Sequence, residues 1–442
     1  METTSTQTAA PAPAESTAAT TATRTTATPT TATPSPQRPA LSRLVGDVTA
    51  FAESVWGREP LRRSDDPQAY ADLFSLDAVD ELVSVRGLRT PFLRLVKDGK
   101  ELPERAYTGS GGIGAAVADQ ARDDSIHDEV GRGATVVLQG LHRVWEPVRS
   151  FSAQLAADLG HPVQVNAYIT PPQSQGFGAH YDVHDVFVLQ FAGEKHWHIH
   201  DPVFPLPLRT QPNHLHAAAI TQAAQGEPTL DVVLRPGDCL YLPRGYLHSA
   251  TALGGVSGHL TIGLPAWTRH SVAEKVLAIV AERLAQDERL RESLPLGVDF
   301  TDSGALTGDL DIVREAVAAA LRDLDTDEVA AGLAQEHADG QRAAPVRPFA
   351  QLAASRDLDE FTRVALRGHL ALRPVHLDDG GVRLIGRNGR FTVPAAEAPG
   401  LDPLLAGETV TPADLAAATG LEPRTATRLV RRLLDAGAVV PA

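Results

Sequence analysis

Hydrophobic residues in the middle of the chain fall in short runs that are separated by glycine and proline. Between residues 133 and 267 the runs are rich in Val, Ile, Leu and aromatic residues: ATVVLQG, PVQVNAYIT, DVFVLQF, KHWHIHDP, LDVVLRPGDCLYLP and GHLTIGLP. Short β-branched runs between such turns are typical of a barrel or sandwich of many strands. The pattern therefore predicts a β-rich domain here.

After residue 270 the hydrophobic spacing becomes helical. VAEKVLAIVAERLA and DIVREAVAAALRDL carry apolar residues three and four positions apart, which predicts amphipathic helices. These helices are too few to form a large core alone. They either pair with the same helices of a second copy or pack on the β-rich domain, and the pattern leaves both arrangements open.

The end of the chain has a third pattern, in TPADLAAATGLEPRTATRLVRRLLDAGAVVPA. Thr411 begins one predicted helix and Gly420 ends it, and Ala426, Leu429 and Leu433 share one face of a second helix that precedes a short strand. This order predicts a helix-turn-helix in a winged-helix layout.

Composition and net charge limit the cellular compartment and the partners that we expect for this chain. The first 40 residues are almost entirely Thr, Ala, Pro and Ser, which predicts a disordered tail, and no run reaches the roughly 20 apolar residues of a membrane span. The single cysteine, Cys239, excludes an internal disulfide and fits a reducing compartment. The formal charge of −15 argues against chain-wide binding of nucleic acid. We expect a cytoplasmic protein without membrane contact.

Two motifs predict a metal site. If HYD lies in a strand, His180 and Asp182 point to the same side, which is half of a site with two histidines and one carboxylate. The stretch GDCLYLPRGYLH presents His248 after a strand and a Pro-Gly bend. Such a triad leaves three of about six iron positions open, whereas zinc prefers four tetrahedral ligands, so the donor set favours Fe(II). The alternative is that HxD arose by chance and holds no metal.

These motifs resemble a known family. GDCLYLPRGYLH fits the second cupin motif, and NAYITPPQSQGFGAHYDVHDVFVLQFAGEKHWHIHDP is similar to the metal-binding core of Jumonji-C (JmjC) oxygenases of the cupin-4, ribosomal-oxygenase group. The resemblance implies an α+β fold in which a double-stranded β-helix precedes a helical dimerisation region and a winged-helix domain. It also implies Fe(II), 2-oxoglutarate and O2, and it matches His180, Asp182 and His248 to the iron ligands.

The resulting domain prediction has four segments. They are a disordered tail (1–40), a JmjC/cupin catalytic domain (41–270), a helical region that could form a homodimer (271–340) and a winged-helix-like domain (345–442).

Lys195 is the predicted contact for the far carboxylate of 2-oxoglutarate. Along EKHWHIH, strand alternation places Lys195 on the same face as Trp197 and Ile199, so this lysine is expected to be buried. A buried lysine needs an anionic partner, which is either a bound carboxylate or an internal Asp or Glu. The histidines share the other face and are expected to contact solvent: His196, His198 and His200.

The resemblance adds further positions. Lys195 stands fifteen residues after His180, where the family keeps a lysine or arginine for 2-oxoglutarate, and Asn166 and Tyr168 match positions that hydrogen-bond the cosubstrate. Ser257 and His259 are expected on a strand that returns past the metal. Ser257 is predicted as a further cosubstrate contact and His259 as support for the metal ligands, and a structural hydrogen bond is the alternative for both. The role of His184 stays open between supporting the ligands and lining the substrate entrance.

The resemblance implies hydroxylation of an unactivated C–H bond, with arginine or histidine side chains of ribosomal proteins as the first substrate hypothesis. Alternatives are a peptide or small molecule of specialised metabolism and, less favoured, demethylation of methyl-lysine. A hypothesis of another class is a DNA-binding regulator with a sensor barrel, in which arginines of the last helix would approach phosphates: Arg424, Arg428, Arg431 and Arg432. The acidic neighbours Glu422 and Asp435 weaken that patch, so DNA binding is not the expected role.

Overall fold

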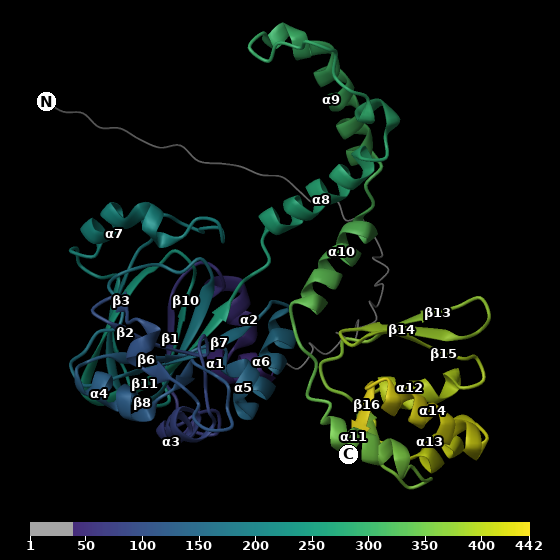
Figure 1. The fold of residues 1–442 in the computed structure, drawn as a ribbon, viewed down its shortest axis with the longest axis horizontal. Coiled ribbons are helices and arrows are strands. Elements are labelled where there is room, and N and C mark those ends of the chain that lie inside the picture. Colours follow the sequence, from purple (N-terminus) through teal and green to yellow (C-terminus); the bar gives the residue numbers. More distant parts are fainter. Residues whose placement is uncertain (1–38) are drawn as a thin grey trace, which may run out of the picture. The chain divides into compact units, whose positions relative to one another are not determined.

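The computed structural model describes residues 39–442 (Figure 1). The tail predicted over residues 1–40 lies almost wholly outside the described residues. Within residues 39–442, no helix combines the length and the apolar character that crossing a bilayer requires.

Short helices and strands open the described chain. They are α1 (Pro39–Val45), α2 (Val48–Ala50), η1 (Phe51–Val55), β1 (Leu61–Arg63), α3 (Leu76–Asp80), η2 (Glu81–Val85), β2 (Leu93–Lys97), β3 (Lys100–Glu101), η3 (Glu104–Ala106), β4 (Thr108–Gly109), β5 (Gln120–Ala121) and α4 (Asp123–Gly131). Apolar side chains of this segment, such as Phe51 and Tyr70, share one buried cluster with Phe187 and Tyr241 of the strands that follow. Side chains of this segment therefore pack on the main sheet, to which the segment also contributes β1, β2 and β3.

The main sheet confirms the many-stranded prediction. Its later elements are β6 (Thr135–Leu138), α5 (Leu141–Val144), α6 (Glu146–Leu159), β7 (Gln164–Thr170), β8 (Asp185–His200), η4 (Asn213–His216), α7 (Ala217–Ala223), β9 (Leu230–Leu234), β10 (Cys239–Leu242) and β11 (Leu247–Leu264). The strand order is β1-β10-β8-β11-β7-β6-β2-β3, and β9 pairs with β8. All neighbouring strands in this sheet run antiparallel.

Two long strands, β8 and β11, form the centre of the sheet. DVFVLQF and KHWHIHDP, which the sequence presents as separate runs, are one 16-residue strand, and the register with β11 shifts near Gly258. Gly193 lies opposite this irregularity with φ of 58°, and a Cβ there would lie 2.2 Å from the carbonyl oxygen of Val256. Glycine is required because the backbone conformation is left-handed and the neighbouring strand leaves no room.

The HYD motif does not lie in a strand, so the prediction of strand geometry there was wrong. Residues 180–184 are an extended segment ahead of β8, with one isolated bridge between His180 and His248. The bridge fixes the backbone in strand pairing only at His180, so strand alternation does not define the side-chain directions of residues 181–184.

The two helices predicted after residue 270 are confirmed. α8 (Arg269–Leu284) and α9 (Thr307–Arg322) contain them, with η5 (Glu288–Arg291) and η6 (Ser303–Leu306) between, and α10 (Thr326–Asp339) follows. Thr268 begins α8 with a reciprocal capping box to Ser271. Arg283 donates to the carbonyl oxygen of Ala320 at 3.0 Å and so ties α8 to α9.

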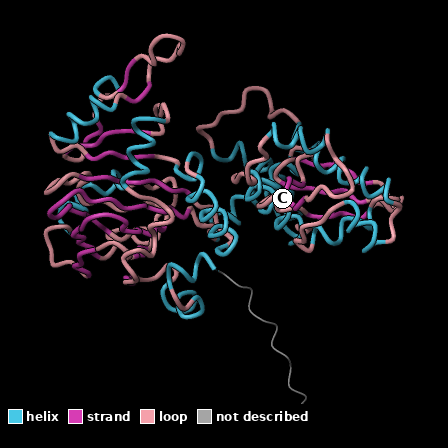
Figure 2. Tube along the Cα trace, turned by 90° about the horizontal axis from the view of Figure 1, so that it is seen from below, coloured by secondary structure: helices cyan, strands magenta, loops and turns pink. Residues whose placement is uncertain are grey.

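The last part of the chain combines helices and small sheets (Figure 2). Its elements are α11 (Pro348–Arg356), β12 (Val364–Leu366), β13 (Arg373–His376), β14 (Val382–Gly386), β15 (Gly389–Val393), η7 (Ala398–Gly400), α12 (Leu401–Leu405), α13 (Pro412–Thr419), α14 (Pro423–Asp435) and β16 (Val439–Pro441). Strands β13, β14 and β15 form one sheet, and β12 pairs with β16.

The predicted helix pair in this part is confirmed. Thr411 caps α13 in a reciprocal box with Asp414, and Gly420 ends it with φ of 70°. The predicted inner face of α14 is buried: Ala426, Leu429 and Leu433.

Replacing Gly193 by alanine tests the requirement at the centre of the sheet. We expect Gly193→Ala to lower the free energy of unfolding by about 3 kcal/mol, because a left-handed alanine costs about 1–2 kcal/mol and the clash with Val256 adds to it. Gly254→Ala is the matched control, since Gly254 has φ of 62° but open space around its Cβ position. Denaturant unfolding measures both, and equal losses would contradict the steric argument.

Candidate functional site

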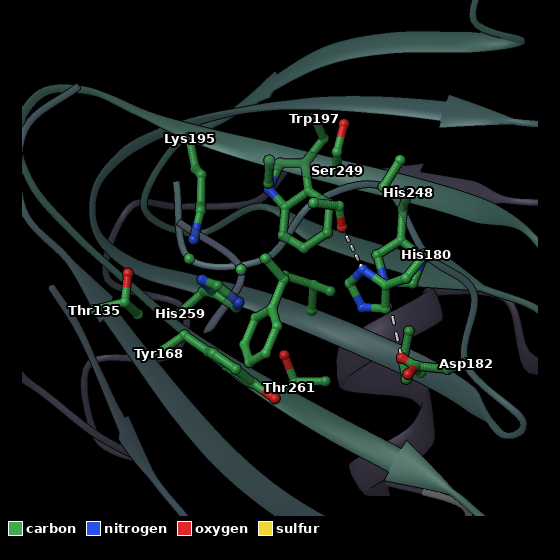
Figure 3. Close-up of a pocket in the computed structure, with 18 of the residues that line it drawn as sticks. Thr135, Tyr168, His180, Asp182, Lys195, Trp197, His248, Ser249, His259 and Thr261 are labelled. Atoms are coloured by element: carbon green, nitrogen blue, oxygen red, sulfur yellow. Dashed lines mark hydrogen bonds and ion pairs between the residues drawn. The ribbon is translucent and has the colours of Figure 1, made fainter. Parts of the chain in front are cut away.

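A cavity of about 420 Å³ opens inside the main sheet (Figure 3). Strands β6, β7, β8 and β11 and the segment before β8 supply its walls. The polar and aromatic side chains that matter most are Thr135, Tyr168, His180, Asp182, Lys195, Trp197, His248 and His259. The cavity therefore brings together residues that lie more than a hundred positions apart in the sequence.

The three predicted metal ligands meet at one end of this cavity. One side-chain donor atom from each of His180, Asp182 and His248 lies within 4.8 Å of the other two. The His248 Nε2 atom is 3.8 Å from the Asp182 Oδ2 atom, and the two imidazole centroids are 4.3 Å apart. The three donors are close enough to converge on one face of an octahedral ion after small side-chain movements.

Backbone hydrogen bonds hold the ligand segments together. His180 N–H donates to the His248 carbonyl at 3.1 Å, and His248 N–H donates to the His180 carbonyl at 2.8 Å. Gly245 N–H donates to the Asp182 carbonyl at 3.1 Å. Gly245 has φ of 92°, and a Cβ there would lie 2.9 Å from the carbonyl oxygen of Phe204, so the Pro-Gly bend requires this glycine.

Each imidazole is oriented by its second nitrogen. The Nδ1 atom of His180 is 2.8 Å from the carbonyl oxygen of Gly178, and that of His248 is 3.1 Å from the carbonyl oxygen of Tyr246. A carbonyl accepts only from a protonated Nδ1, which leaves the lone pair on Nε2 for a metal.

The protonation states also suit metal binding. Burial, together with the neighbouring His180, lowers the pKa of His248 to about 4, so its imidazole is neutral at neutral pH. For Asp182, burial acts to raise the pKa, but the neighbouring histidines, His248 first, bring it below the ordinary value. A neutral imidazole and an ionised carboxylate are the forms that bind metal.

Lys195 lies at the other end of the cavity, as predicted. Its side chain is 5% exposed, and its Nζ donates to the Thr170 hydroxyl at 3.2 Å, which in turn lies 3.2 Å from the Thr135 hydroxyl. Among residues 39–442 no carboxylate forms an ion pair with Lys195, so the internal partner considered from the sequence is not found. Burial lowers the pKa of Lys195 to about 7.

Aromatic rings form the wall between the two ends. Tyr168 stacks on His259 with centroids 5.1 Å apart, and Trp197 meets His259 edge-on at 5.5 Å. Burial, followed by Lys195, lowers the pKa of His259 well below its ordinary value, so this ring is neutral. In the described part of the chain, neither His259 Nδ1 nor Trp197 Nε1 has a hydrogen-bond partner.

Several predicted positions lie elsewhere. Ser257 is fully buried, and its hydroxyl accepts from the Gln190 amide at 2.9 Å, away from the cavity lining, which supports the structural alternative. Asn166 accepts from Gly140 N–H at 3.0 Å and does not line the cavity either. His184 lies 3.2 Å from the Gln164 amide and is also outside the lining.

The prediction that His200 faces solvent was wrong, whereas His196 and His198 are partly exposed as expected. His200 is 8% exposed and pairs across the sheet with the fully buried Leu247. Leu247 packs with Ile220 of α7, so the insertion between β8 and β9 covers this end of β8.

Sequence reasoning missed the hydroxyl pair beside Lys195 and a cationic wall residue. Thr135 is the first residue of β6 and Thr170 is the last residue of β7, and neither belongs to a recognisable motif. Only the pairing of the two strands reveals their contact. Arg94 of β2 reaches the cavity and stacks over Phe177, with its guanidinium carbon 5.7 Å from the ring centroid. No local signal in the sequence links β2 to the metal site.

Comparison with protein families now defines the class. Residues 143–272 match the JmjC domain family, and this range contains every candidate metal ligand. These residues form a JmjC domain, and the resemblance predicted from the sequence is confirmed.

Curated relatives carry the names of oxygenases and hydroxylases. Ribosomal oxygenase 1 of Gallus gallus is 33% identical over 267 residues, which are 56% of this chain and 40% of the relative. The bifunctional lysine-specific demethylase and histidyl-hydroxylase NO66 of Drosophila persimilis is 29% identical over 266 residues, 58% of this chain and 36% of the relative. The chain thus spans well under half the length of these relatives.

Solved structures show the same fold. The crystal structure of the Escherichia coli ribosomal oxygenase YcfD is 18% identical, with a TM-score of 0.50 over 90% of this chain and 98% of that chain. A second structure of E. coli YcfD gives a TM-score of 0.52 over 89% of this chain and 97% of that chain. At this identity the likeness establishes the fold alone.

Removing one predicted ligand tests the metal centre. We expect His248→Ala to weaken Co(II) binding, used as an air-stable substitute for Fe(II), by at least about 100-fold, because one of three donors is lost. His184→Ala is the control, since His184 lies near Asp182 but bonds Gln164. Equilibrium dialysis measures the Co(II) affinity of the cluster His180, Asp182 and His248, and unchanged binding at this cluster in His248→Ala would refute the assignment.

Proposed function

We propose that this protein is an Fe(II)- and 2-oxoglutarate-dependent oxygenase that hydroxylates an unactivated C–H bond. The single observation that carries the proposal is the cavity itself, with a two-histidine, one-carboxylate cluster at one end and, at the other, a buried lysine that has no anionic partner within residues 39–442. The JmjC domain match and the ribosomal-oxygenase relatives support it.

The residues fit an iron ion. Two imidazole nitrogens and one carboxylate oxygen suit Fe(II) and leave positions for small ligands. The Nδ1 atoms of His180 and His248 are already bound to backbone carbonyls, so only Nε2 is available to the metal. Gly178 and Tyr246 thus orient the ligands through their carbonyl oxygens.

The residues also fit a dicarboxylate. Lys195 has a hydroxyl partner but no anion among residues 39–442, and an uncompensated buried ammonium is costly. A carboxylate beside Lys195, Thr170 and Thr135 would supply that anion. Its far end would then extend toward the triad.

When bound, iron with 2-oxoglutarate and O2 supplies the oxidising power for hydroxylation. The chain binds and orients the metal, the cosubstrate and the substrate, and it keeps bulk water out of the cavity. Tyr168, Trp197 and His259 form the apolar wall between the triad and Lys195, and the low pKa of His259 keeps a second positive charge away from Lys195.

The depressed pKa of Lys195 predicts how 2-oxoglutarate binding depends on pH. Without ligand the lysine loses its proton above about pH 7, whereas the bound carboxylate requires the ammonium, so binding takes up a proton. We expect affinity to be level below pH 7 and to fall about tenfold per pH unit above it. Calorimetry in buffers of different ionisation enthalpy measures both affinity and proton uptake.

Lys195→Arg is the matched variant for this measurement. Because arginine stays protonated throughout the range, its affinity should not vary with pH between 6.5 and 9, while Lys195→Met should bind weakly at every pH. A pH-dependent Lys195→Arg variant would show that another group causes the effect.

For the substrate, we propose a side chain of a ribosomal protein, of the arginine or histidine type. The names of the relatives support this class, and the net charge of −15 suits a basic partner. The alternatives from the sequence, a peptide or small molecule and a methyl-lysine, use the same site.

A mass measurement separates these substrates. We expect incubation with Fe(II), 2-oxoglutarate and ribosomal proteins to add one oxygen to one of them, and expect Asp182→Ala to abolish the gain. Loss of a methyl group would indicate demethylation instead. Turnover with a small molecule and no change in any ribosomal protein would overturn the substrate proposal.

We also propose roles for the remaining segments, with domain limits near residues 41–270, 271–340 and 345–442. Exposed apolar side chains on α8 and α9 support pairing with a second copy: Val272, Leu277, Leu310, Ile312, Val313 and Leu321. The α13–α14 pair with β16 supports a winged-helix assignment. A cytoplasmic location is consistent with the one buried, free cysteine, Cys239.

The internal contacts of α14 do not favour the DNA-binding alternative. Arg428 and Arg432 both donate to Glu397, which is only 2% exposed, at 2.6 and 2.9 Å. Arg431 donates to the carbonyl oxygen of Ser355. Three of the four arginines that could have contacted phosphates are therefore engaged within their own fold, which weakens the DNA-binding alternative.

A further inference from the structure

A second cluster of metal-binding side chains lies on the outer face of the main sheet, away from the cavity. We propose that His196, His198 and Asp231 form a binding site for Zn²⁺ or a similar divalent transition metal. One donor atom from each residue lies within 4.8 Å of the other two. This site has no part in the proposed oxygenase chemistry and stands whether or not that function is correct.

The pairing of β8 with β9 brings the three side chains together. His196 and His198 are two positions apart on β8 and so project to the same side, while Asp231 on β9 is the cross-strand partner of His198. The two imidazole centroids are 4.2 Å apart. Because Lys195 and Trp197 alternate with these histidines, the cluster and the cavity lie on opposite faces of one strand.

The distances fit a tetrahedral ion with little movement. Donor atoms about 2.0–2.1 Å from zinc lie about 3.3 Å from one another. The His198 Nε2 atom is 3.7 Å from Asp231 Oδ2, and His196 Nε2 contacts Asp231 Oδ1 directly. All three side chains are 30–53% exposed, which leaves a fourth position for water and allows small rotations.

A histidine–carboxylate hydrogen bond is the simpler explanation, but it accounts for only part of the cluster. It explains the contact of His196 with Asp231. It leaves His198, whose ring faces the same carboxylate yet has no hydrogen bond within residues 39–442. No lysine or arginine of the described residues pairs with Asp231, and the nearby Arg235 pairs with Glu194. Within the described residues the ion-pair partners of Asp231 are therefore histidines alone, and no permanent cation neutralises it.

The donor set favours a divalent transition metal over calcium or magnesium, and redox-inert zinc is the probe for it. Two imidazoles suit borderline transition metals, whereas calcium and magnesium prefer oxygen ligands alone. The ion would join β8 to β9, which lies beside β8 off the main strand path. A metal at this position should therefore stabilise β9 against separation from the sheet.

Counting zinc ions tests the proposal, since the catalytic triad will also take zinc. We expect equilibrium dialysis of the full-length, untagged protein to give two zinc ions per chain. His248→Ala should retain one ion, bound at the outer cluster, and its melting temperature should rise when zinc is added. Asp231→Asn, which preserves side-chain shape, should retain only the ion of the triad.

The double variant His248→Ala/Asp231→Asn completes the design. It should bind zinc at least 100-fold more weakly than His248→Ala and should show no rise in melting temperature. His376→Ala, which removes an exposed histidine on β13, is the control and should bind two ions. The proposal is overturned if His248→Ala binds no zinc, or if Asp231→Asn and His198→Ala leave the outer site unchanged.

Discussion

The pair of backbone hydrogen bonds between His180 and His248 is the constraint on which the site depends. It joins the segment before β8 to the start of β11, and the Gly245 N–H adds a third hydrogen bond, to the carbonyl of Asp182. Backbone bonds of this kind fix the positions of the Cα atoms, so the side chains converge without relying on a metal. The low pKa of His248 follows from the same burial and keeps its nitrogen unprotonated.

The buried lysine is the complementary feature. Folding places an ammonium group where its charge is poorly solvated, and the fall of its pKa to about 7 measures that cost. Such strain is common at functional sites, where a ligand supplies the missing partner. The Thr170 hydroxyl, itself bonded to the Thr135 hydroxyl, accepts a hydrogen bond from Lys195 without neutralising it.

Strand β8 faces two different environments. Residues 186 and 188 of β8 line the cavity, Lys195 and Trp197 continue it, and His196 and His198 look outward at positions between them. The irregular backbone at Gly193 shifts the alternation of side chains along β8. Residues 186 and 188 before it and residues 195 and 197 after it therefore face the same cavity. Any ion bound outside would therefore lie one residue away from the lysine that faces the cavity.

The sequence alone determined the local features: the strand-rich region, the helices, the caps at Thr411 and Gly420, the three candidate metal ligands and the buried side of Lys195. Each follows from residue type and from side-chain periods of two or about four, which act over a few neighbours. Only the tertiary structure decided that residues 180–184 leave the strand, that α7 covers His200, that Gln190 engages Ser257, and that Thr135 meets Thr170 beside Lys195. These outcomes depend on strand register and on long insertions, which join residues that no local pattern relates.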